Sequence, residues 1–111
     1  MWTVHYDSRL EDWLDGIPPE IKARILRIVD MLAAYGPQNV REPYVKPVRG
    51  HKKMFEIRAK GKDGIARVFY FTFTGRKIIL VHGFIKKSAK TPAREIETAS
   101  RRMKEVLKWL K

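Results

Sequence analysis

Hydrophobic residues at the start of the chain follow first a strand pattern and then a helix pattern. Residues 2–6 (WTVHY) are rich in β-forming side chains and predict a first strand. The next apolar positions have the i, i+3, i+4, i+7 spacing of one helical face: Leu10, Trp13, Leu14 and Ile17. Ser8 and Glu11 have the spacing of a capping box, so we expect this helix to have Ser8 as its N-cap and to end at Gly16.

A second, longer helical pattern follows the Pro18–Pro19 pair. Its apolar stripe consists of Ile21, Ile25, Ile28, Val29 and Leu32. Because proline is favoured in the first turn of a helix and glycine just after its end, the pattern predicts a helix over residues 20–35 that stops at Gly36. Three prolines then fall within residues 37–53, which indicates a long connection with one short edge strand near residues 44–48.

Three further strands are predicted in the centre of the chain. Residues 54–60 (MFEIRAK) alternate between apolar and polar side chains. Residues 65–73 (IARVFYFTF) are more continuously apolar, as expected of a central strand that is covered on both faces. A tight turn joins this strand to residues 77–84 (KIILVHGF), so the two should form a hairpin. Arg67 is the charged residue of the central strand and shares the register of its phenylalanines.

After these strands come a basic loop and an amphipathic helix. Thr91 is expected to be the N-cap of that helix, with Pro92 at its first position. Its apolar side consists of Ile96, Ala99, Met103, Val106 and Leu110. The predicted order of elements is β-α-α-(β)-β-β-β-α, which is an α+β fold in a single domain over residues 1–111.

The composition supports a folded domain and excludes several classes of protein. With 111 residues, of which 44% are hydrophobic, the chain can bury one core, so its 32% of charged residues cover a folded surface. The absence of cysteine excludes disulfides and thiolate chemistry and is typical of a reducing compartment, so we expect a cytoplasmic protein. The apolar runs are strand-sized, and we expect neither a signal peptide nor a membrane span.

Positive charge is concentrated in one part of the chain. Residues 1–40 hold four basic and six acidic side chains, whereas residues 41–111 hold twenty basic and six acidic ones. A basic surface can serve solubility alone, and an anionic membrane is a weaker alternative. A net charge of +12 that lies in one region is, however, the pattern of a protein that neutralises a phosphate backbone. We therefore expect nucleic acid, and RNA in particular, as the partner.

The sequence offers no motif for metal or cofactor chemistry. It has no phosphate-binding loop, dinucleotide fingerprint or HExxH motif. The acidic residues of the basic region are too scattered to suggest a two-metal nuclease. We expect no metal and no cofactor.

The second half of the sequence resembles a known family. The segments FEIR (55–58), GIARVFYF (64–71) and ILVHGFIKKSAKTPAREIETASRRM (79–103) are similar to the phage-derived, HigB-like branch of the RelE/ParE toxin superfamily. The most specific part is the FIKK loop followed by KTP and the EIETA helix. The resemblance implies a compact antiparallel sheet of about four strands, with two N-terminal helices and a C-terminal helix.

What the resemblance implies about function is the toxin of a type II toxin–antitoxin system. The usual activity in the HigB and RelE branches is ribosome-dependent cleavage of mRNA, which inhibits translation. The expected partners are mRNA on the ribosome and a helix-turn-helix antitoxin encoded by a neighbouring gene. Two alternatives remain open: a gyrase inhibitor of the ParE kind and an RNA-binding module without catalysis.

Candidate site residues follow from the family's basic sheet face. The matching positions are Arg58, Arg67, Lys86 and Lys87, to which the strand residue His82 is added as a proton carrier. RNA contacts are expected from four further cations around the last helix: Lys90, Arg94, Arg101 and Arg102. The chain lacks the C-terminal tyrosine known in RelE, since its tyrosines are at 6, 35, 44 and 70. The resemblance therefore leaves the proton-transfer groups open.

Cleavage of RNA without a metal makes specific demands on such a site. The ribose 2′-OH must be aligned with the phosphate and lose its proton, the phosphate charge must be stabilised, and the leaving oxygen must be protonated. Clustered cations meet the charge requirement. A lysine beside another cation gives up its proton more readily, so Lys86 next to Lys87 is one candidate for proton transfer. His82 and Glu56 are the others.

Each of these residues also has a purely structural interpretation. Arg58 and Arg67 could pair with a carboxylate of the first helix, for which the candidates are Glu11, Asp12 and Asp15. His82 shares its predicted strand face with Leu80 and Phe84, where a packed histidine is common. The lysine pair and the basic face of the last helix could be solvated surface.

Overall fold

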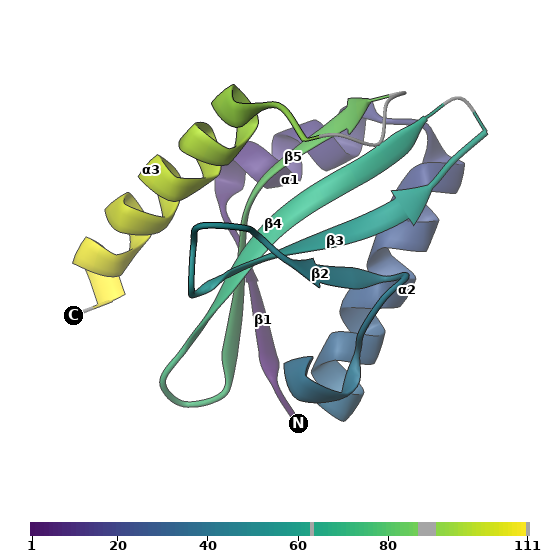
Figure 1. Ribbon diagram of the computed structural model, residues 1–111. Helices are drawn as coiled ribbons and strands as arrows, with labels where there is room; N and C mark the ends of the chain where they lie inside the picture. Colours follow the sequence, from purple (N-terminus) through teal and green to yellow (C-terminus); the bar gives the residue numbers. More distant parts are fainter. Residues whose placement is uncertain (63, 87–90, 111) are drawn as a thin grey trace.

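The computed structural model has one five-stranded sheet with helices on both of its faces (Figure 1). It describes residues 1–62, 64–86 and 91–110. The elements in chain order are β1 (Thr3–Tyr6), α1 (Ser8–Gly16), α2 (Pro19–Tyr35), the short 3₁₀ helix η1 (Pro37–Asn39), β2 (Val45–Pro47), β3 (Met54–Lys60), β4 (Ile65–Phe73), β5 (Lys77–Lys86) and α3 (Ala93–Leu110). The predicted order of helices and strands and the α+β class are confirmed.

The strand order in the sheet is β1-β5-β4-β3-β2. The pairs β2–β3, β3–β4 and β4–β5 are antiparallel, as expected. β1, however, pairs with β5 in parallel, so the sheet has five strands and one parallel edge. This pairing joins the first strand of the chain to the last. A parallel pair needs a long connection between its strands, and here the rest of the sheet and two helices supply it.

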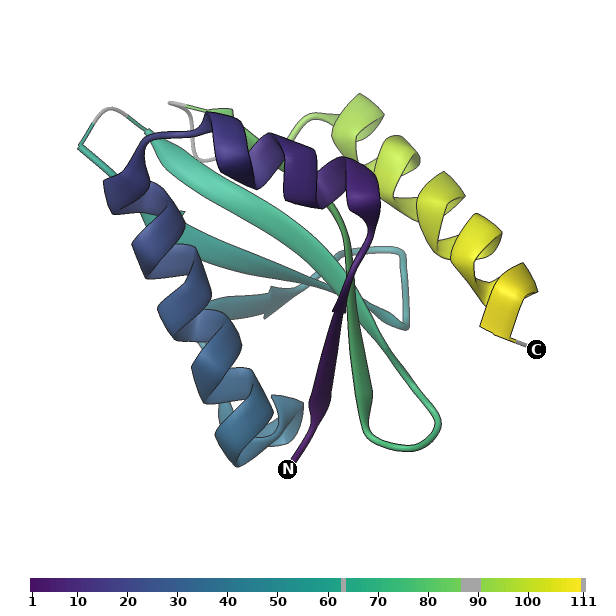
Figure 2. The same cartoon turned by 180° about the vertical axis from the view of Figure 1, so that it is seen from behind.

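Helices cover both faces of the sheet and create two cores. α1 and α2 lie over one face, as seen from behind in Figure 2, and α3 lies on the other. The core beneath α1 and α2 includes Leu10, Leu14, Ile25, Leu32, Ile57, Val68, Tyr70 and Leu80. The core beneath α3 consists of Val48, Met54, Phe69, Phe71, Ile79, Val81 and Ala99. β4 contributes to both cores, which confirms that it is covered on both faces.

A bulge in β5 changes the face on which His82 lies. Phe69 of β4 pairs with His82. The next residue of β4, Tyr70, pairs with Leu80, so Val81 is an extra residue in β5. One extra residue moves the side chains that follow it to the opposite face of the sheet. The prediction that His82 shares a face with Leu80 was therefore wrong: His82 lies on the α3 side.

Two helix starts differ from the predicted caps. The N-cap of α1 is Asp7, whose side chain accepts a hydrogen bond from the backbone N of Arg9 at 2.9 Å, and not Ser8. At the start of α3 the carbonyl of Pro92 accepts from the backbone N of Ile96 at 3.4 Å. Pro92 therefore takes the N-cap position expected for Thr91. No helix within the described residues is long and apolar enough to span a membrane.

Gly83 allows α1 to pack closely on β5. A Cβ atom at Gly83 would lie only 2.5 Å from the Trp13 ring, a distance that real side chains do not adopt. Trp13 is partly buried and packs against the core beneath α1 and α2, so a shift of its indole would disturb that packing. Glycine is required at this position because the Trp13 ring of α1 lies so close to the β5 backbone.

This packing generates a stability prediction. We expect Gly83→Ala to lower the free energy of unfolding by about 1–3 kcal/mol, because the added methyl group overpacks the Trp13 contact. Gly16→Ala is the matched control, since nothing lies within 4 Å of its Cβ position and alanine is favoured in a helix. Urea unfolding of both variants checks the prediction. Equal stabilities of the two variants would contradict it.

Candidate nucleic-acid interface

Cations from two strands meet at one end of the sheet. In β3, Arg58 lies opposite Arg67 of β4, and Lys60 lies opposite Ile65. Ile65 in turn pairs with Lys86 of β5. Because neighbouring strands are about 4.8 Å apart, the β3 and β5 backbones that carry these cations are separated by roughly 10 Å, with β4 between them. We call Arg58, Lys60 and Lys86 the strand-end cations.

The strand-end cations share the sheet face on which α3 lies. Directly paired residues of neighbouring strands project to the same side of a sheet. Arg58 is therefore on the side of Phe84, through its register with Arg67, and Phe84 packs against the core beneath α3. Lys60 is exposed, while Arg58 and Lys86 are half-buried. This arrangement suits a phosphate chain that crosses the strands. The predicted residues Lys87 and Lys90 lie outside the described residues.

Arg67 lies beneath this surface and not on it. Its residue surface is 2% exposed, and that of Glu56 is 4% exposed. Arg67 Nη1 donates a hydrogen bond to Glu56 Oε1, so the two form a buried ion pair. The Thr91 hydroxyl donates to the same carboxylate at 3.3 Å. The alternative of a first-helix carboxylate as partner was wrong, since a charge in a sheet covered on both faces must be neutralised locally.

Arg58 lies beside this ion pair, directly opposite Arg67 on the neighbouring strand. It forms no ion pair with the residues that the structure describes. Its Nε is buried without a hydrogen-bond partner among those residues. Its backbone N donates to the carbonyl of Tyr44 at 2.8 Å, which fixes the position of the strand. The half-buried guanidinium, which has no carboxylate partner among the described residues, suits an acceptor such as a phosphate oxygen.

His82 is held by two residues of α3. Its Nε2 lies 2.7 Å from Glu95 Oε1, and its Nδ1 lies 3.2 Å from Arg102 Nη1. Since a guanidinium can only donate, Nδ1 must accept and Nε2 must carry the hydrogen that Glu95 accepts. The ring also lies beside Phe69 and Phe84, with centroids 6.1 and 6.4 Å away, and the three rings form one cluster. Both nitrogens are engaged, so the geometry suits a residue that positions α3.

Arg102 turns inward and does not extend into solvent. It donates from Nη1 to the carbonyl of Val81 at 3.1 Å. Burial and the nearby Arg9 guanidinium lower the pKa of Arg102. Hydrogen bonds from Arg9 hold the pKa of the Asp7 carboxyl below its usual range. Arg9 also reaches Glu105 at 3.2 Å, so an ion pair joins α1 to α3. The hydrogen bonds of Arg102 to Val81 and His82 thus attach α3 to β5.

The other predicted contacts of α3 are surface cations. Arg94 is 86% exposed in its side chain, and Arg101 is exposed as well. Tyr70, a possible proton carrier, is fully buried, and burial raises the pKa of its hydroxyl. Among the described residues, no three His, Asp or Glu side chains converge as a metal-ligand set.

Three residues of this region were not among the predicted ones. Lys60 follows Arg58 by two positions in a strand, so the alternation of side chains could have identified it. No local sequence pattern identifies Glu95 and Thr91. Glu95 contacts His82 and Thr91 contacts Glu56 only because of the way the chain folds back after β5.

The buried ion pair generates a prediction by double substitution. Arg67→Met and Glu56→Met should each destabilise the fold by about 3–5 kcal/mol, because each leaves a charge buried without its partner. The double variant should be more stable than the sum of the two effects predicts, by about 2 kcal/mol or more.

Unfolding in urea measures all three variants, and a surface pair gives the control. Lys22 and Asp15 form an exposed ion pair at 3.1 Å, for which the coupling should be at most about 1 kcal/mol. Strictly additive effects of the Arg67 and Glu56 substitutions would disprove the coupling.

Comparison with known proteins places this geometry in a family. A family model described as "Phage derived protein Gp49-like (DUF891)" matches residues 12–104. No curated protein sequence matches the chain significantly. Among solved structures, the fold is similar to a chain in the RelE–RelB complex from Pyrococcus horikoshii OT3, with 23% sequence identity and a TM-score of 0.57. The match covers 81% of this chain and 98% of that one.

These matches confirm the expected RelE-like fold and show a Gp49-like family. They do not show whether the chain belongs to the HigB-like branch. The Gp49-like match begins within α1 and spans α2 and the whole region that carries the strand-end cations. This chain belongs to the Gp49-like family of phage-derived proteins and has a RelE-like fold.

Proposed function

We propose that this chain is the toxin of a type II toxin–antitoxin pair, a metal-independent endoribonuclease that cleaves mRNA on the ribosome. The observation that carries the proposal is the set of strand-end cations on a RelE-like fold. These cations lie beside the buried Glu56–Arg67 ion pair, whose opposite charges cancel. The family match and the net charge of +12 support it. We also propose that this toxin belongs to the HigB-like branch.

The proposed reaction uses the substrate's own 2′-OH as the nucleophile. Attack on the adjacent phosphorus forms a 2′,3′-cyclic phosphate and breaks the bond to the 5′-oxygen of the next nucleotide. Arg58, Lys60 and Lys86 stabilise the negative charge that grows on the phosphate oxygens. The proposed proton carriers are Lys86 and Lys87: one takes the proton of the 2′-OH, and another cation of the site protonates the leaving oxygen.

The remaining predicted residues have supporting roles in this proposal. Arg67 keeps Glu56 and β3 in place and so positions Arg58, its direct neighbour across the strands. His82 and Arg102 fix α3 on the sheet. Arg94 and Arg101 are exposed on α3 and are proposed, with Lys90, to contact RNA of the ribosome.

The proposed partners follow from the same function. The RelE chain of the similar structure is in complex with RelB, which supports an antitoxin partner for this chain. A helix-turn-helix antitoxin from a neighbouring gene is the form we propose. A protein that acts on translating ribosomes works in the cytoplasm.

The proposed site predicts a specific pattern of rate loss. In single-turnover cleavage on preassembled ribosome complexes, at least one of Arg58→Ala, Lys86→Ala and Lys87→Ala should slow cleavage by about 10²-fold with far smaller effects on ribosome binding. Lys22→Ala is the control, since Lys22 pairs with Asp15 at 3.1 Å on the helix hairpin. The products should carry 2′,3′-cyclic phosphate and 5′-hydroxyl ends.

Two results would overturn parts of this proposal. Products with 3′-hydroxyl and 5′-phosphate ends would indicate attack by an activated water and would refute the 2′-OH mechanism. Cyclic ends with normal rates in all three variants would keep the enzyme class but refute the site assignment.

A further inference from the structure

A hollow of about 400 Å³ lies at the end of the sheet opposite the strand-end cations. Arg76, in the turn between β4 and β5, lines it together with the residues that end α2 and form η1. The first residues of the chain connect these parts: Trp2 N donates to the carbonyl of Ala33 at 3.0 Å, and Thr3 N donates to that of Arg76 at 2.9 Å. Figure 1 shows the start of β1 beside η1 at this end of the sheet. Because β4 has nine residues, the strand-end cations are roughly 25–30 Å away.

Two aromatic side chains line this hollow. The Trp2 indole lies against Gly36: a Cβ atom at Gly36 would be only 3.1 Å from Trp2 Nε1, and the Gly36 φ of 86° also favours glycine. Tyr35, the residue before this glycine, is 66% exposed. An exposed ring offers a flat surface for stacking, and every nucleobase has a π-face that fits it. The two rings therefore suit a planar, aromatic ligand.

The polar side chains of the hollow suit the edge of a base and a phosphate. Arg76 is exposed and forms no ion pair with the part of the chain that the structure describes, so its guanidinium is available for two parallel hydrogen bonds to phosphate oxygens. Gln38 and Asn39 carry amides, the groups that pair with the N6/N7 edge of adenine. Asn39 Nδ2 donates to the carbonyl of Tyr35 at 2.6 Å, which orients that amide. None of the nine residues that line the hollow is acidic, so none of them repels a phosphate.

The backbone conformation of Arg76 also sets this residue apart. Its φ is 58°, and among the described residues it is the one non-glycine residue with a positive φ. Glycine or asparagine adopts this left-handed conformation with less strain. Strained residues of this kind concentrate at binding and active sites, where the side chain is needed in spite of the strain. The turn itself does not need an arginine, whereas the hollow gains its cation from it.

From these features we infer that the hollow binds a purine nucleotide, either free or as part of an RNA strand. The base stacks on the rings of Trp2 and Tyr35, and the amides of Gln38 and Asn39 bind its edge. The phosphate binds Arg76. The inference goes beyond the proposed function, because the hollow lies far from the strand-end cations and can be filled whether or not the chain cleaves RNA.

Titration with adenosine 5′-monophosphate (AMP) tests the site directly. In NMR spectra of the ¹⁵N-labelled protein, AMP should shift the indole signal of Trp2 and the amide signals of Tyr35, Gln38 and Arg76. Adenosine, which lacks the phosphate, should bind about tenfold more weakly. A short oligoadenylate RNA distinguishes the two sources of the ligand through the same signals: equal affinities per site indicate a free nucleotide, and much tighter binding of the RNA indicates a nucleotide within a strand.

Substitutions separate a binding role from a structural one. Arg76→Asn should fold, because asparagine tolerates the left-handed backbone, and it should remove the advantage of AMP over adenosine. Tyr35→Ala should weaken the binding of both ligands by about tenfold, because it removes a stacking surface. The NMR spectrum of each variant verifies that it is folded.

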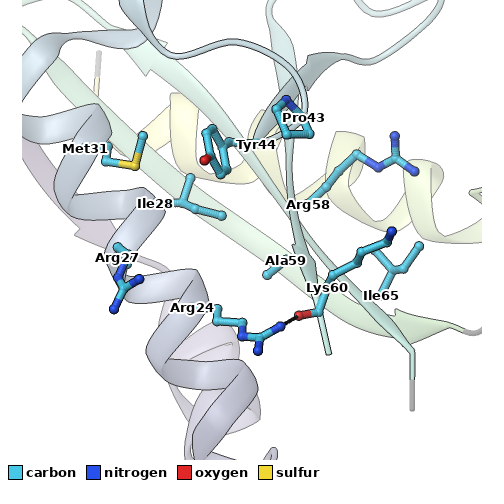
Figure 3. Close-up of a pocket in the computed structure, with 10 residues that line it drawn as sticks. All are labelled: Arg24, Arg27, Ile28, Met31, Pro43, Tyr44, Arg58, Ala59, Lys60 and Ile65. Carbon is cyan, nitrogen blue, oxygen red and sulfur yellow. Dashed lines mark hydrogen bonds between the residues drawn. The ribbon is translucent and has the colours of Figure 1, made fainter. Parts of the chain in front are cut away.

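Two matched controls exclude general effects of charge and of exposed rings. Arg49→Asn removes the same charge from an exposed position outside the hollow. Tyr44→Ala removes an exposed ring that lines a separate hollow between α2 and β3 (Figure 3). Both should change AMP affinity by less than about twofold, because screened charges and rings outside the hollow contribute little.

Three outcomes would overturn the inference. These are no shift of the Trp2 signal with either AMP or the oligoadenylate, equal affinities of the unaltered protein for AMP and adenosine, or an equal loss of affinity in the hollow variants and the controls. Because binding is measured on the isolated protein, the result is independent of RNA cleavage. A chain that cleaves RNA but ignores both ligands would refute the nucleotide site alone, and a chain that binds AMP without cleaving RNA would refute the proposed function alone.

Discussion

The structure depends on the neutralisation of one buried arginine. Arg67 lies in the central strand of a sheet that has helices on both faces, and a guanidinium at 2% exposure is tolerated only with a carboxylate at hand. Glu56 on the neighbouring strand supplies it, and the Thr91 hydroxyl joins the pair from the segment before α3. The pair links β3 to β4, and its hydrogen bond from Thr91 brings the segment before α3 to the sheet.

The placement of α3 determines which cations remain at the surface. Its first turn and its middle hold His82 from both sides, through Glu95 and Arg102, so two arginines and a histidine of the basic region serve the fold. What is left at the sheet end is Arg58, Lys60 and Lys86, with Arg94 and Arg101 on the outer face of α3. The basic composition thus separates into a structural part and an exposed part that is available for phosphate.

Local patterns in the sequence predicted the helices, the central strands and the basic surface, because each follows from spacing along the chain. The features that depend on contacts between distant segments were not predictable in this way. The parallel pairing of β1 with β5 is one example, and the bulge at Val81, which moves His82 to the other face, is a second. The partner of Arg67 was misassigned for a related reason: residues 56 and 67 are diagonal neighbours on β3 and β4, which is evident only once the hairpin register is known.

The most direct test of the central claim, that this chain stops translation, is pulse labelling of cells after its expression without a partner. The account predicts that incorporation of labelled amino acids falls within minutes while incorporation of labelled thymidine continues, and that Lys86→Ala, which removes one of the strand-end cations, weakens this arrest. Continued protein synthesis together with a fall in DNA synthesis and a DNA-damage response would contradict the account and would point to inhibition of gyrase.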